Sequence, residues 1–299
     1  MIHPAPLPPH LASLDRTLVM GVVNVTPDSF SDGGRWFEPD AAVAHGRRHV
    51  AEGADLLDVG GESTRPGSAR VAIDEELRRV LPVVRELAAE GHAVSVDTTR
   101  AQVAEQAVAA GAVVVNDVSG GLADPALARV VAETGVVYVA MHWRGHAVVM
   151  DTLTAYDDVV VDVRDELAVR VEALLAAGAA REQVVLDPGL GFAKAGSDNW
   201  PLLAHLDVLR GLGLPVLVGA SRKRFLGHLL ARAGEQPVPP EERDDATAAV
   251  STLAAAAGAW CVRVHEVRPT ADAVRVVRAW VDAARPGPAG DADTARWAP

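Results

Sequence analysis

The feature that most constrains this chain is an apolar segment followed by an amphipathic segment, repeated eight times. The apolar segments are Leu18–Thr26, Leu56–Glu62, Ala93–Thr98, Val113–Ser119, Val136–His142, Val184–Pro188, Pro215–Ser221 and Trp260–His265. The amphipathic, helical segments are Ala41–Glu52, Glu75–Glu90, Arg100–Ala110, Pro125–Thr134, Val159–Ala177, Trp200–Leu212, Asp245–Ala257 and Thr270–Ala284. Strands that alternate with crossover helices form parallel sheets, and eight such units close into a barrel. The pattern predicts a single-domain α/β fold, a (β/α)8 TIM barrel.

An open, doubly wound sheet is the structural alternative. It requires a G-x-G-x-x-G turn that leads directly from an early strand into a helix. Here the first strand instead leads into the long polar loop Pro27–Pro39, so the barrel is favoured. We expect an N-terminal extension over residues 1–16, the barrel over 17–285 and a disordered tail over 286–299.

Composition excludes several classes of protein. The net charge of −12 argues against a nucleic-acid partner, because phosphate backbones recruit basic surfaces. No window reaches the roughly 20 apolar residues of a membrane span, and the single cysteine, Cys261, fits a reducing compartment. We therefore expect a cytoplasmic protein that binds neither nucleic acid nor membrane.

Hydrogen-bonding and charged residues stand at or near the ends of nearly all the predicted strands. They are Asn24, Glu62, Asp97, Asn116, Asp117, His142, Asp187, Ser221 to Arg224, Arg263 and His265. Each alone could be a helix cap or a turn residue. Asp97 and Asp187, however, directly follow apolar strands, where an unpaired carboxylate costs several kcal/mol. The C-terminal strand ends of a barrel carry its active site, so these positions predict a ligand with matching donors.

Basic residues gather at the same end of this acidic chain. They are Arg65, Arg222, Lys223, Arg224, Arg263 and His265. We expect the run Ser221–Arg224 to open the seventh helix, whose N-terminal amides favour anions. The alternative is a solvated basic helix start. Arg263 lies inside a strand, so it should face either a carboxylate of the barrel or an anionic ligand.

Extended motifs lie between Met20 and about Trp280: Met20–Gly34, Asp58–Gly67, Val96–Thr98, Asn116–Gly121, Met141–His142, Asp187–Lys194, Gly219–Phe225 and Arg263–His265. Together these motifs resemble the dihydropteroate synthase family over almost the whole chain. The resemblance implies that the chain joins 7,8-dihydropterin-6-ylmethyl diphosphate to p-aminobenzoate in folate biosynthesis, giving 7,8-dihydropteroate and diphosphate. It also implies Mg²⁺ as a cofactor, sulfonamide inhibitors and a homodimer formed through the late helices.

The resemblance also implies roles for individual residues. The residues with implied catalytic roles are Asp97, Lys223, Arg263, His265 and Asp28. The residues implied to bind the pterin ring are Asp97, Asn116, Met141, Asp187, Phe192, Gly219 and Lys223. The residues implied to bind diphosphate are Asn24, Thr64, Arg65, Arg263 and His265, and Asn24 is also the implied Mg²⁺ ligand. The residues implied to bind p-aminobenzoate are Phe30, Thr64, Arg65, Pro66, Phe192, Lys223 and Arg224. Arg224 departs from the family, in which many members have Ser, and it could pair with the p-aminobenzoate carboxylate or point to solvent.

The implied mechanism is dissociative. Diphosphate leaves first, Asp97 stabilises the remaining pterin-methyl cation, and the neutral arylamine then attacks. Two alternatives share part of the pattern: a pterin-binding methyltransferase module and a degenerate paralogue that binds pterin without turnover. The methyltransferase module has no use for Ser221–Lys223, Arg263–His265 or the loop Thr26–Gly34, all of which are present here.

Overall fold

A computed structural model describes residues 2–26, 39–62, 70–145 and 152–284. Its central element is a sheet of eight parallel strands in the order β6-β5-β4-β3-β2-β1-β8-β7. A bridge between Leu186 and Val216 links β6 to β7, which brings the two ends of the sheet together. The strands are β1 (Leu18–Asn24), β2 (Leu56–Gly60), β3 (Val94–Asp97), β4 (Val114–Asp117), β5 (Val137–Met141), β6 (Val184–Asp187), β7 (Leu217–Val218) and β8 (Cys261–Val264).

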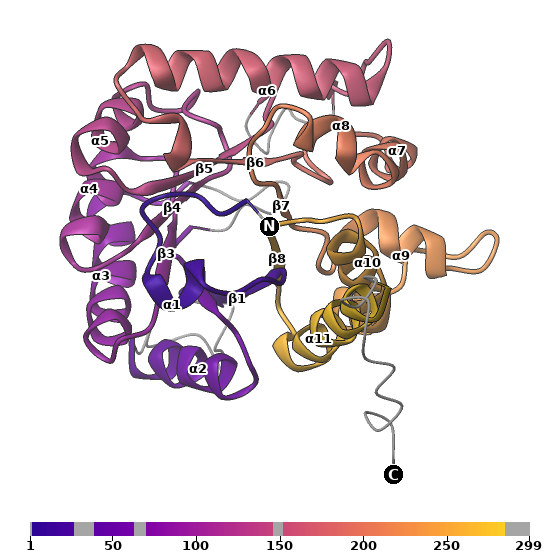
Figure 1. The fold of residues 1–299 in the computed structure, drawn as a ribbon, viewed down its shortest axis with the longest axis horizontal. Coiled ribbons are helices and arrows are strands. Elements are labelled where there is room, and N and C mark those ends of the chain that lie inside the picture. Colours follow the sequence, from indigo (N-terminus) through magenta and orange to yellow (C-terminus); the bar gives the residue numbers. More distant parts are fainter. Residues whose placement is uncertain (1, 27–38, 63–69, 146–151, 285–299) are drawn as a thin grey trace, which may run out of the picture.

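Helices cover the outside of this ring of strands (Figure 1). They are α2 (Pro39–Ala51), α3 (Ile73–Ala89), α4 (Ala101–Ala109), α5 (Ala126–Thr134), α6 (Val159–Ala176), α7 (Asn199–Ala204), α8 (Leu206–Arg210), α9 (Arg224–Leu230), α10 (Asp244–Ala256) and α11 (Val267–Ala284). The short helix α1 (Pro9–Ala12) precedes the barrel, and 3-10 turns lie at Arg181–Gln183, Gly196–Asp198 and Pro240–Arg243. The predicted TIM barrel is confirmed. None of the helices in the described ranges is long and apolar enough to cross a membrane.

Two predicted helices differ from the structure. The segment Trp200–Leu212 forms two helices, α7 and α8, because His205 between them has φ −119° and ψ 41°, outside the helical region. The run Ser221–Arg224 does not open a helix, because Arg222 has a positive φ of 58°. α9 begins only at Arg224, and it has only seven residues. The run Ser221–Lys223 therefore precedes the helix rather than forming its first turn, and the expected anion site stays a prediction.

Side chains of the strands alternate between the inside of the barrel and the surrounding helices, as the period of two requires. Residues such as Val19, Val59 and Val115 face outward into a large aliphatic layer between strands and helices. The inward set forms a separate, smaller core that includes Leu18, Met20, Leu56, Val114, Val137, Val185, Leu217 and Cys261. Cys261 is therefore a core residue.

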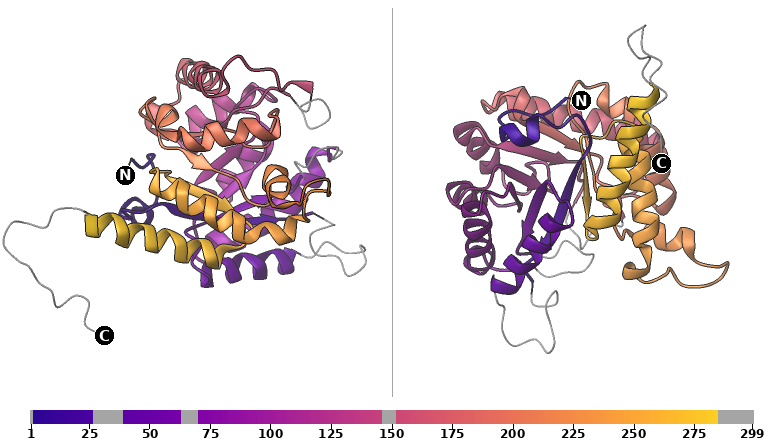
Figure 2. Two further views of the ribbon diagram at one scale, coloured as in Figure 1. Left: turned by 90° about the vertical axis from the view of Figure 1, so that its right-hand side faces the viewer. Right: turned by 60° about the horizontal axis from the view of Figure 1, so that its bottom comes forward.

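The N-terminal segment closes one end of the barrel. Leu11 of α1 is only 2% exposed and belongs to the inner core, together with Trp260. The Ala5 amide donates to the Glu182 carbonyl at 2.7 Å, and the Trp260 indole donates to His3 at 3.3 Å. Figure 2 shows this segment at the same side of the molecule as the end of α11. Since it covers the N-terminal strand ends, the opposite end is left for a ligand.

Candidate active site

The inside of the barrel changes from apolar to charged toward the C-terminal strand ends. The register places Asp58 beside Ser95 and Asp97 beside Asn116 on neighbouring strands. Met141 of β5 lies beside Asp187 of β6 in the same way. Inward side chains of adjacent parallel strands lie close together, so most of the strand-end residues predicted for the pterin share one face of the site.

Arg263 lies inside the barrel between two carboxylates. Its Nε donates to Asp58 Oδ2 at 2.6 Å, and its Nη2 donates to Asp97 Oδ2 at 2.8 Å. Asn116 Nδ2 donates to the same Asp58 oxygen at 2.9 Å. Of the two alternatives for Arg263, the structure shows the carboxylate pairing. The guanidinium thus holds a fixed place beside the predicted pterin residues Asp97 and Asn116.

Sequence reasoning missed Asp58 as a site residue. It is fully buried, and its second oxygen, Oδ1, has no hydrogen-bond partner. Asp58 stands in the middle of β2 rather than at its end, so a search of strand ends passes over it. The available signal was a carboxylate inside the apolar run Leu56–Gly60, which demands a buried partner.

Burial governs the charge state of Asp97. Desolvation raises the pKa of this carboxyl from 3.8 to about 7, and Arg263 opposes the rise while Asp58 adds to it. A carboxyl whose pKa lies near 7 changes its charge within the working range of an enzyme. Such perturbed groups concentrate at functional sites.

A second carboxylate, Asp187, ends β6 and faces a lysine. Burial raises the pKa of Asp187, and Lys223 and the Gly189 amide, which donates to Oδ1 at 2.7 Å, act against that rise. Burial also lowers the pKa of Lys223 to about 8. The Lys223 ammonium lies 3.9 Å from the centre of the Phe192 ring, a cation–π contact. Gly219 borders the Asp187 carboxylate, because a Cβ there would lie 3.8 Å from Oδ2.

The predicted anion residues are only partly brought together. His265 Nδ1 lies 2.9 Å from Ser221 Oγ, which also accepts from the His265 amide at 3.1 Å. Arg222 forms ion pairs with Asp244 and Glu266, so its charge is paired within the fold. Arg224 is exposed at the start of α9.

Other predicted residues have structural partners or lie outside the described ranges. Glu62 accepts from Arg100 at 3.0 Å, and Asp117 accepts from the buried Tyr138 hydroxyl at 2.6 Å. Both carboxylates therefore tie loops to neighbouring elements. The predicted site residues outside the described ranges are Asp28, Phe30, Thr64, Arg65 and Pro66.

The residues fit a magnesium ion held mainly by substrate. Asn24 ends β1 with a half-buried carboxamide, and amide oxygens are suitable Mg²⁺ ligands. Within the described ranges no three His, Cys, Asp or Glu side chains are grouped as a metal site. Mg²⁺ often takes one or two protein ligands and completes its shell with water and phosphate oxygens, which matches a single asparagine.

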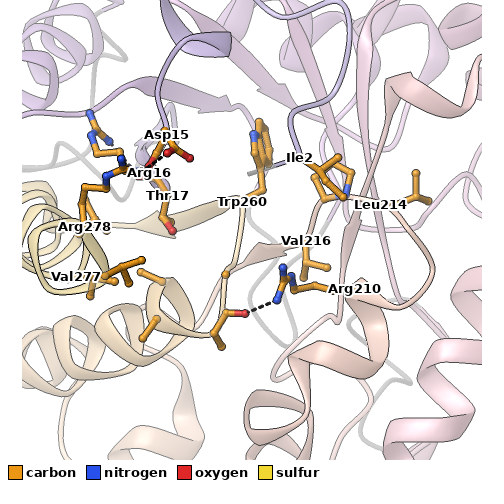
Figure 3. A pocket seen from close by; sticks show the side chains of 17 residues that line it. Ile2, Asp15, Arg16, Thr17, Arg210, Leu214, Val216, Trp260, Val277 and Arg278 are labelled. Carbon is orange, nitrogen blue, oxygen red and sulfur yellow. Dashed lines mark hydrogen bonds and ion pairs between the residues drawn. The ribbon is translucent and has the colours of Figure 1, made fainter. Parts of the chain in front are cut away.

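A cavity of about 360 Å³ lies at the opposite end of the barrel (Figure 3). Its lining includes Arg16, Arg210, Trp260 and Arg278. Each of these arginines already has a partner: Arg16 pairs with Asp55, Arg278 pairs with Asp15, and Arg210 donates to the Ala257 carbonyl. The arginines of this cavity are thus paired within the fold. The carboxyls and the lysine whose pKa values are shifted by burial lie instead at the C-terminal strand ends.

Known proteins share both this fold and most of this sequence. The profile of the family described as "Pterin binding enzyme" matches residues 20–265. A dihydropteroate synthase of Mycobacterium leprae is 55% identical over 276 residues, which are 91% of this chain and 96% of the relative.

Solved structures of dihydropteroate synthases are also similar to this chain in sequence and in fold. A Xanthomonas albilineans dihydropteroate synthase with 4-aminobenzoic acid is 48% identical, with a TM-score of 0.83 over 91% of this chain and 95% of that chain. A Yersinia pestis dihydropteroate synthase with a sulfonamide drug is 41% identical, with a TM-score of 0.84 over 93% and 98%. Family profile, sequence and fold therefore agree: the chain belongs to the pterin binding enzymes and, among them, to the dihydropteroate synthase family.

Proposed function

We infer that this barrel catalyses the dihydropteroate synthase reaction of folate biosynthesis. The bond between the pterin methylene carbon and the diphosphate oxygen breaks, and a carbon–nitrogen bond to p-aminobenzoate forms while the arylamine loses a proton. The observation that carries this inference is the group Asp97, Asn116, Asp187 and Lys223 at the C-terminal strand ends of a chain in this family.

We propose that Asp187 and Asn116 hold the pterin ring. A pterin presents adjacent amino and ring N–H donors on one edge, which an ionised carboxylate accepts in bidentate fashion. Burial of Asp187 strengthens that pairing, because an unpaired donor edge would be costly inside the barrel. Met141, beside Asp187 in the register, and Phe192 support the ring through apolar contact.

We propose that Asp97 stabilises the positive charge that develops on the pterin methylene. Arg263 donates to Asp97 Oδ2 at 2.8 Å, which fixes the carboxylate before substrate arrives. A preorganised charge in a buried site stabilises a transition state without reorganisation at the moment of reaction. In its ionised form Asp97 supplies this charge.

We assign the leaving group to residues at the ends of β1 and β8. We propose that His265, Arg263 and Asn24 bind diphosphate and that Asn24 also holds Mg²⁺. When bound, Mg²⁺ would neutralise charge on the diphosphate. The Ser221 hydroxyl at 2.9 Å from His265 Nδ1 orients that imidazole. The remaining proposed residues for p-aminobenzoate include Phe192, Lys223 and Arg224.

A direct assay tests the proposed activity. Purified protein incubated with the pterin diphosphate, p-aminobenzoate and Mg²⁺ should form 7,8-dihydropteroate, detected by chromatography. A sulfonamide, as a mimic of p-aminobenzoate, should compete. Product formation in the Asp187→Ala variant at the rate of the unchanged protein would contradict the assigned pterin site, and no product from the unchanged protein would contradict the activity.

We propose that the chain forms a homodimer through α10 and α11. The outer face of α10 after Asp245 carries no charged side chain up to Ala256, and Leu253 on it is 70% exposed. On α11, Val276 and Trp280 are 63% and 78% exposed. Neighbouring apolar helix faces of this kind favour association.

Sedimentation of a charged variant tests the dimer. Leu253→Glu should convert the dimer into a monomer, because the charge would be buried in the interface. Leu229→Glu is the matched control, since Leu229 is 62% exposed on α9. A monomeric unchanged protein, or a Leu253→Glu variant that remains dimeric, would contradict this interface.

A further inference from the structure

The chain uses lysine at only two positions. Of its 28 basic Lys and Arg residues, only Lys194 and Lys223 are lysines. Lys223, after β7, lies beside Asp187 and Phe192. Lys194 lies in the loop after β6. Lys194 is only 7% exposed. Lysine is almost never fully buried unless its ammonium is paired. The burial of Lys194 therefore requires partners within the fold.

The Lys194 ammonium joins two loops of the active end. Its Nζ lies 3.0 Å from His142 Nδ1 and donates to the Phe192 carbonyl at 3.0 Å. His142 follows β5, and its amide donates to the Asp187 carbonyl at 2.8 Å. The backbone of Gly189 is so close that a Cβ there would lie 3.4 Å from Nζ. A compact ammonium fits this space better than a planar guanidinium.

The tautomer of His142 suits an ammonium donor. His142 is 2% exposed, and its Nε2 lies 3.0 Å from Glu166 Oε2 on α6. An ionised carboxylate only accepts hydrogen bonds, so Nε2 carries the proton and Nδ1 is the acceptor. Burial lowers the pKa of His142 to about 4, which keeps the ring neutral. The contact with Glu166 thus leaves His142 Nδ1 as the acceptor of a hydrogen bond from the Lys194 ammonium.

Lys194 also supports Phe192 and Asp187, two residues of the proposed pterin site, which is here called the pterin slot. The carbonyl it binds belongs to Phe192, whose ring lies against the Lys223 ammonium. Ala193, between Phe192 and Lys194, has φ 47°, a left-handed conformation that is unfavourable for alanine. The loop is therefore held in this conformation by its contacts. The Lys194 charge also counters the burial that raises the pKa of Asp187.

We propose that Lys194 is a positioning residue of the pterin slot, which ties the loop after β6 to His142 and keeps Asp187 ionised for the incoming ring. This inference rests on the proposed function, because it assigns the ring to Asp187. It predicts two separable effects of Lys194. One is mechanical, through the Phe192 carbonyl, and the other is electrostatic, through the charge beside Asp187.

The electrostatic effect has a defined direction with pH. Pterin binding needs ionised Asp187, so affinity falls as pH falls through the pKa of that carboxyl. Removal of the Lys194 charge raises this pKa further, and the fall in affinity then moves to higher pH. The groups that face Lys194, from the loops after β5, β6 and β7 and from α6, are His142, Arg144, Glu166, Asp187 and Lys223.

Calorimetry with a pterin fragment across pH tests the proposal in the full chain. Lys194→Met should weaken binding about tenfold or more, since it removes a charge-assisted hydrogen bond and leaves the Phe192 carbonyl unpaired. It should also move the acid fall in affinity to higher pH. Lys194→Gln keeps a donor for that carbonyl, so it should lose less affinity but show the same pH shift. Arg164→Met removes an exposed cation from α6 and should change neither.

Lysine-selective ¹³C labelling adds a measurement independent of activity. Two Cε resonances are expected, and Lys194→Met should remove one of them. The Lys194 resonance should titrate near pH 7, because burial lowers the pKa of this amine to about 7. A neutral Lys194 amine at the pH where pterin binds tightly would overturn the ammonium that the proposal requires.

Each outcome decides the question. Weaker binding together with the pH shift supports the proposal, and Lys194→Gln supplies the same test if Lys194→Met does not fold. Weaker binding with an unmoved pH profile would overturn it, because Lys194 would then act by packing alone. Unchanged binding in a folded variant would also overturn it. If the unchanged protein binds no pterin, the proposed function fails instead.

Discussion

At the scale of single residues, the active end is organised around one arginine and two carboxylates. The Arg263 guanidinium contacts both Asp58 and Asp97. The sequence predicted a partner for Arg263 without deciding between a carboxylate and a ligand. It could not decide because strand register sets which inward residues meet, and a period of two does not reveal register. Asp58 was missed because it stands in the middle of β2 rather than at the end of the strand.

Asp97→Asn should stabilise the folded protein while removing turnover. The pKa of Asp97 is raised from 3.8 to about 7 by burial, so its ionised form destabilises the fold. That penalty is full above about pH 7 and disappears as pH falls toward 3.8. Because Asp58 still pairs with Arg263, the neutral amide should gain about 1–3 kcal/mol at pH 8.

Denaturant unfolding at pH 8 and pH 5 measures this difference, and a product assay measures the loss of turnover, about 100-fold or more. A stability difference that is equal at both pH values would show that Asp97 is not the titrating group. Turnover that survives in the variant would remove Asp97 from the catalytic residues.

Asp187→Ala should weaken binding of a pterin fragment by about 2–5 kcal/mol, because the donor edge of the ring is left unpaired in a buried site. In the unchanged protein, affinity should fall on acidification at a higher pH than an exposed aspartate would give, since burial raises the pKa of Asp187. Calorimetry provides both results. Asp165→Ala, at an exposed position on α6, is the control, and equal affinities of the two variants would make Asp187 a turn residue.

At the scale of elements, the alternation of strand and helix could be predicted closely, but local backbone conformations could not. Seven of the eight predicted helices lie within three residues of the observed bounds, whereas Trp200–Leu212 is interrupted at His205. Hydrophobic periodicity reports which face of an element is buried. It does not report a single residue such as Arg222, whose φ of 58° delays the start of α9.

The loop after β6 depends on a glycine at position 189. Gly189 has φ 66°, and a Cβ there would lie 2.3 Å from the His142 carbonyl oxygen. Gly189→Ala should therefore displace the loop, lower the free energy of unfolding by about 2–4 kcal/mol and weaken pterin binding.

Gly135→Ala is the matched control, because Gly135 ends α5 with φ 70° and a Cβ there would contact nothing within 4 Å. It should cost about 1 kcal/mol and leave pterin affinity unchanged. Denaturant unfolding and calorimetry compare the two variants. Equal effects would show that the left-handed conformation alone, rather than the contact with His142, accounts for the loss.

At the scale of the whole molecule, the two ends of the barrel differ in the side chains that they carry. The N-terminal strand ends are closed by residues of the N-terminal segment, and the C-terminal strand ends carry the perturbed carboxyls and lysines. The sequence predicted that a ligand binds at the C-terminal strand ends, because polar residues follow the strands there. For residues 1–16 the sequence predicted an N-terminal extension without a role in the core. This segment contributes Leu11 to the inner core, and Leu7 and Leu14 pack against the same core. Because α1 has only four residues, the leucine spacing was too short a pattern to predict this burial.

Leu11→Ala should lower stability without affecting catalysis. Leu11 is 2% exposed in the inner core, so its truncation should cost about 2–5 kcal/mol of the free energy of unfolding. Leu229→Ala, at a 62% exposed leucine, should cost little. Thermal unfolding and steady-state kinetics distinguish the effects, and a reduced kcat at temperatures where Leu11→Ala is fully folded would contradict a role for Leu11 in stability alone.

The scarcity of lysine gives this protein an unusual response to proteases. An endoprotease that cleaves only after lysine has two sites in the whole chain, Lys194 and Lys223, and both belong to the loops that surround the pterin slot. Cleavage by such an enzyme in the native state requires local opening of the chain around the bond. Its rate therefore reports openings that expose this one end of the barrel, whereas trypsin can cut at arginines throughout the fold. Pterin should slow digestion by the lysine-specific protease far more than digestion by trypsin.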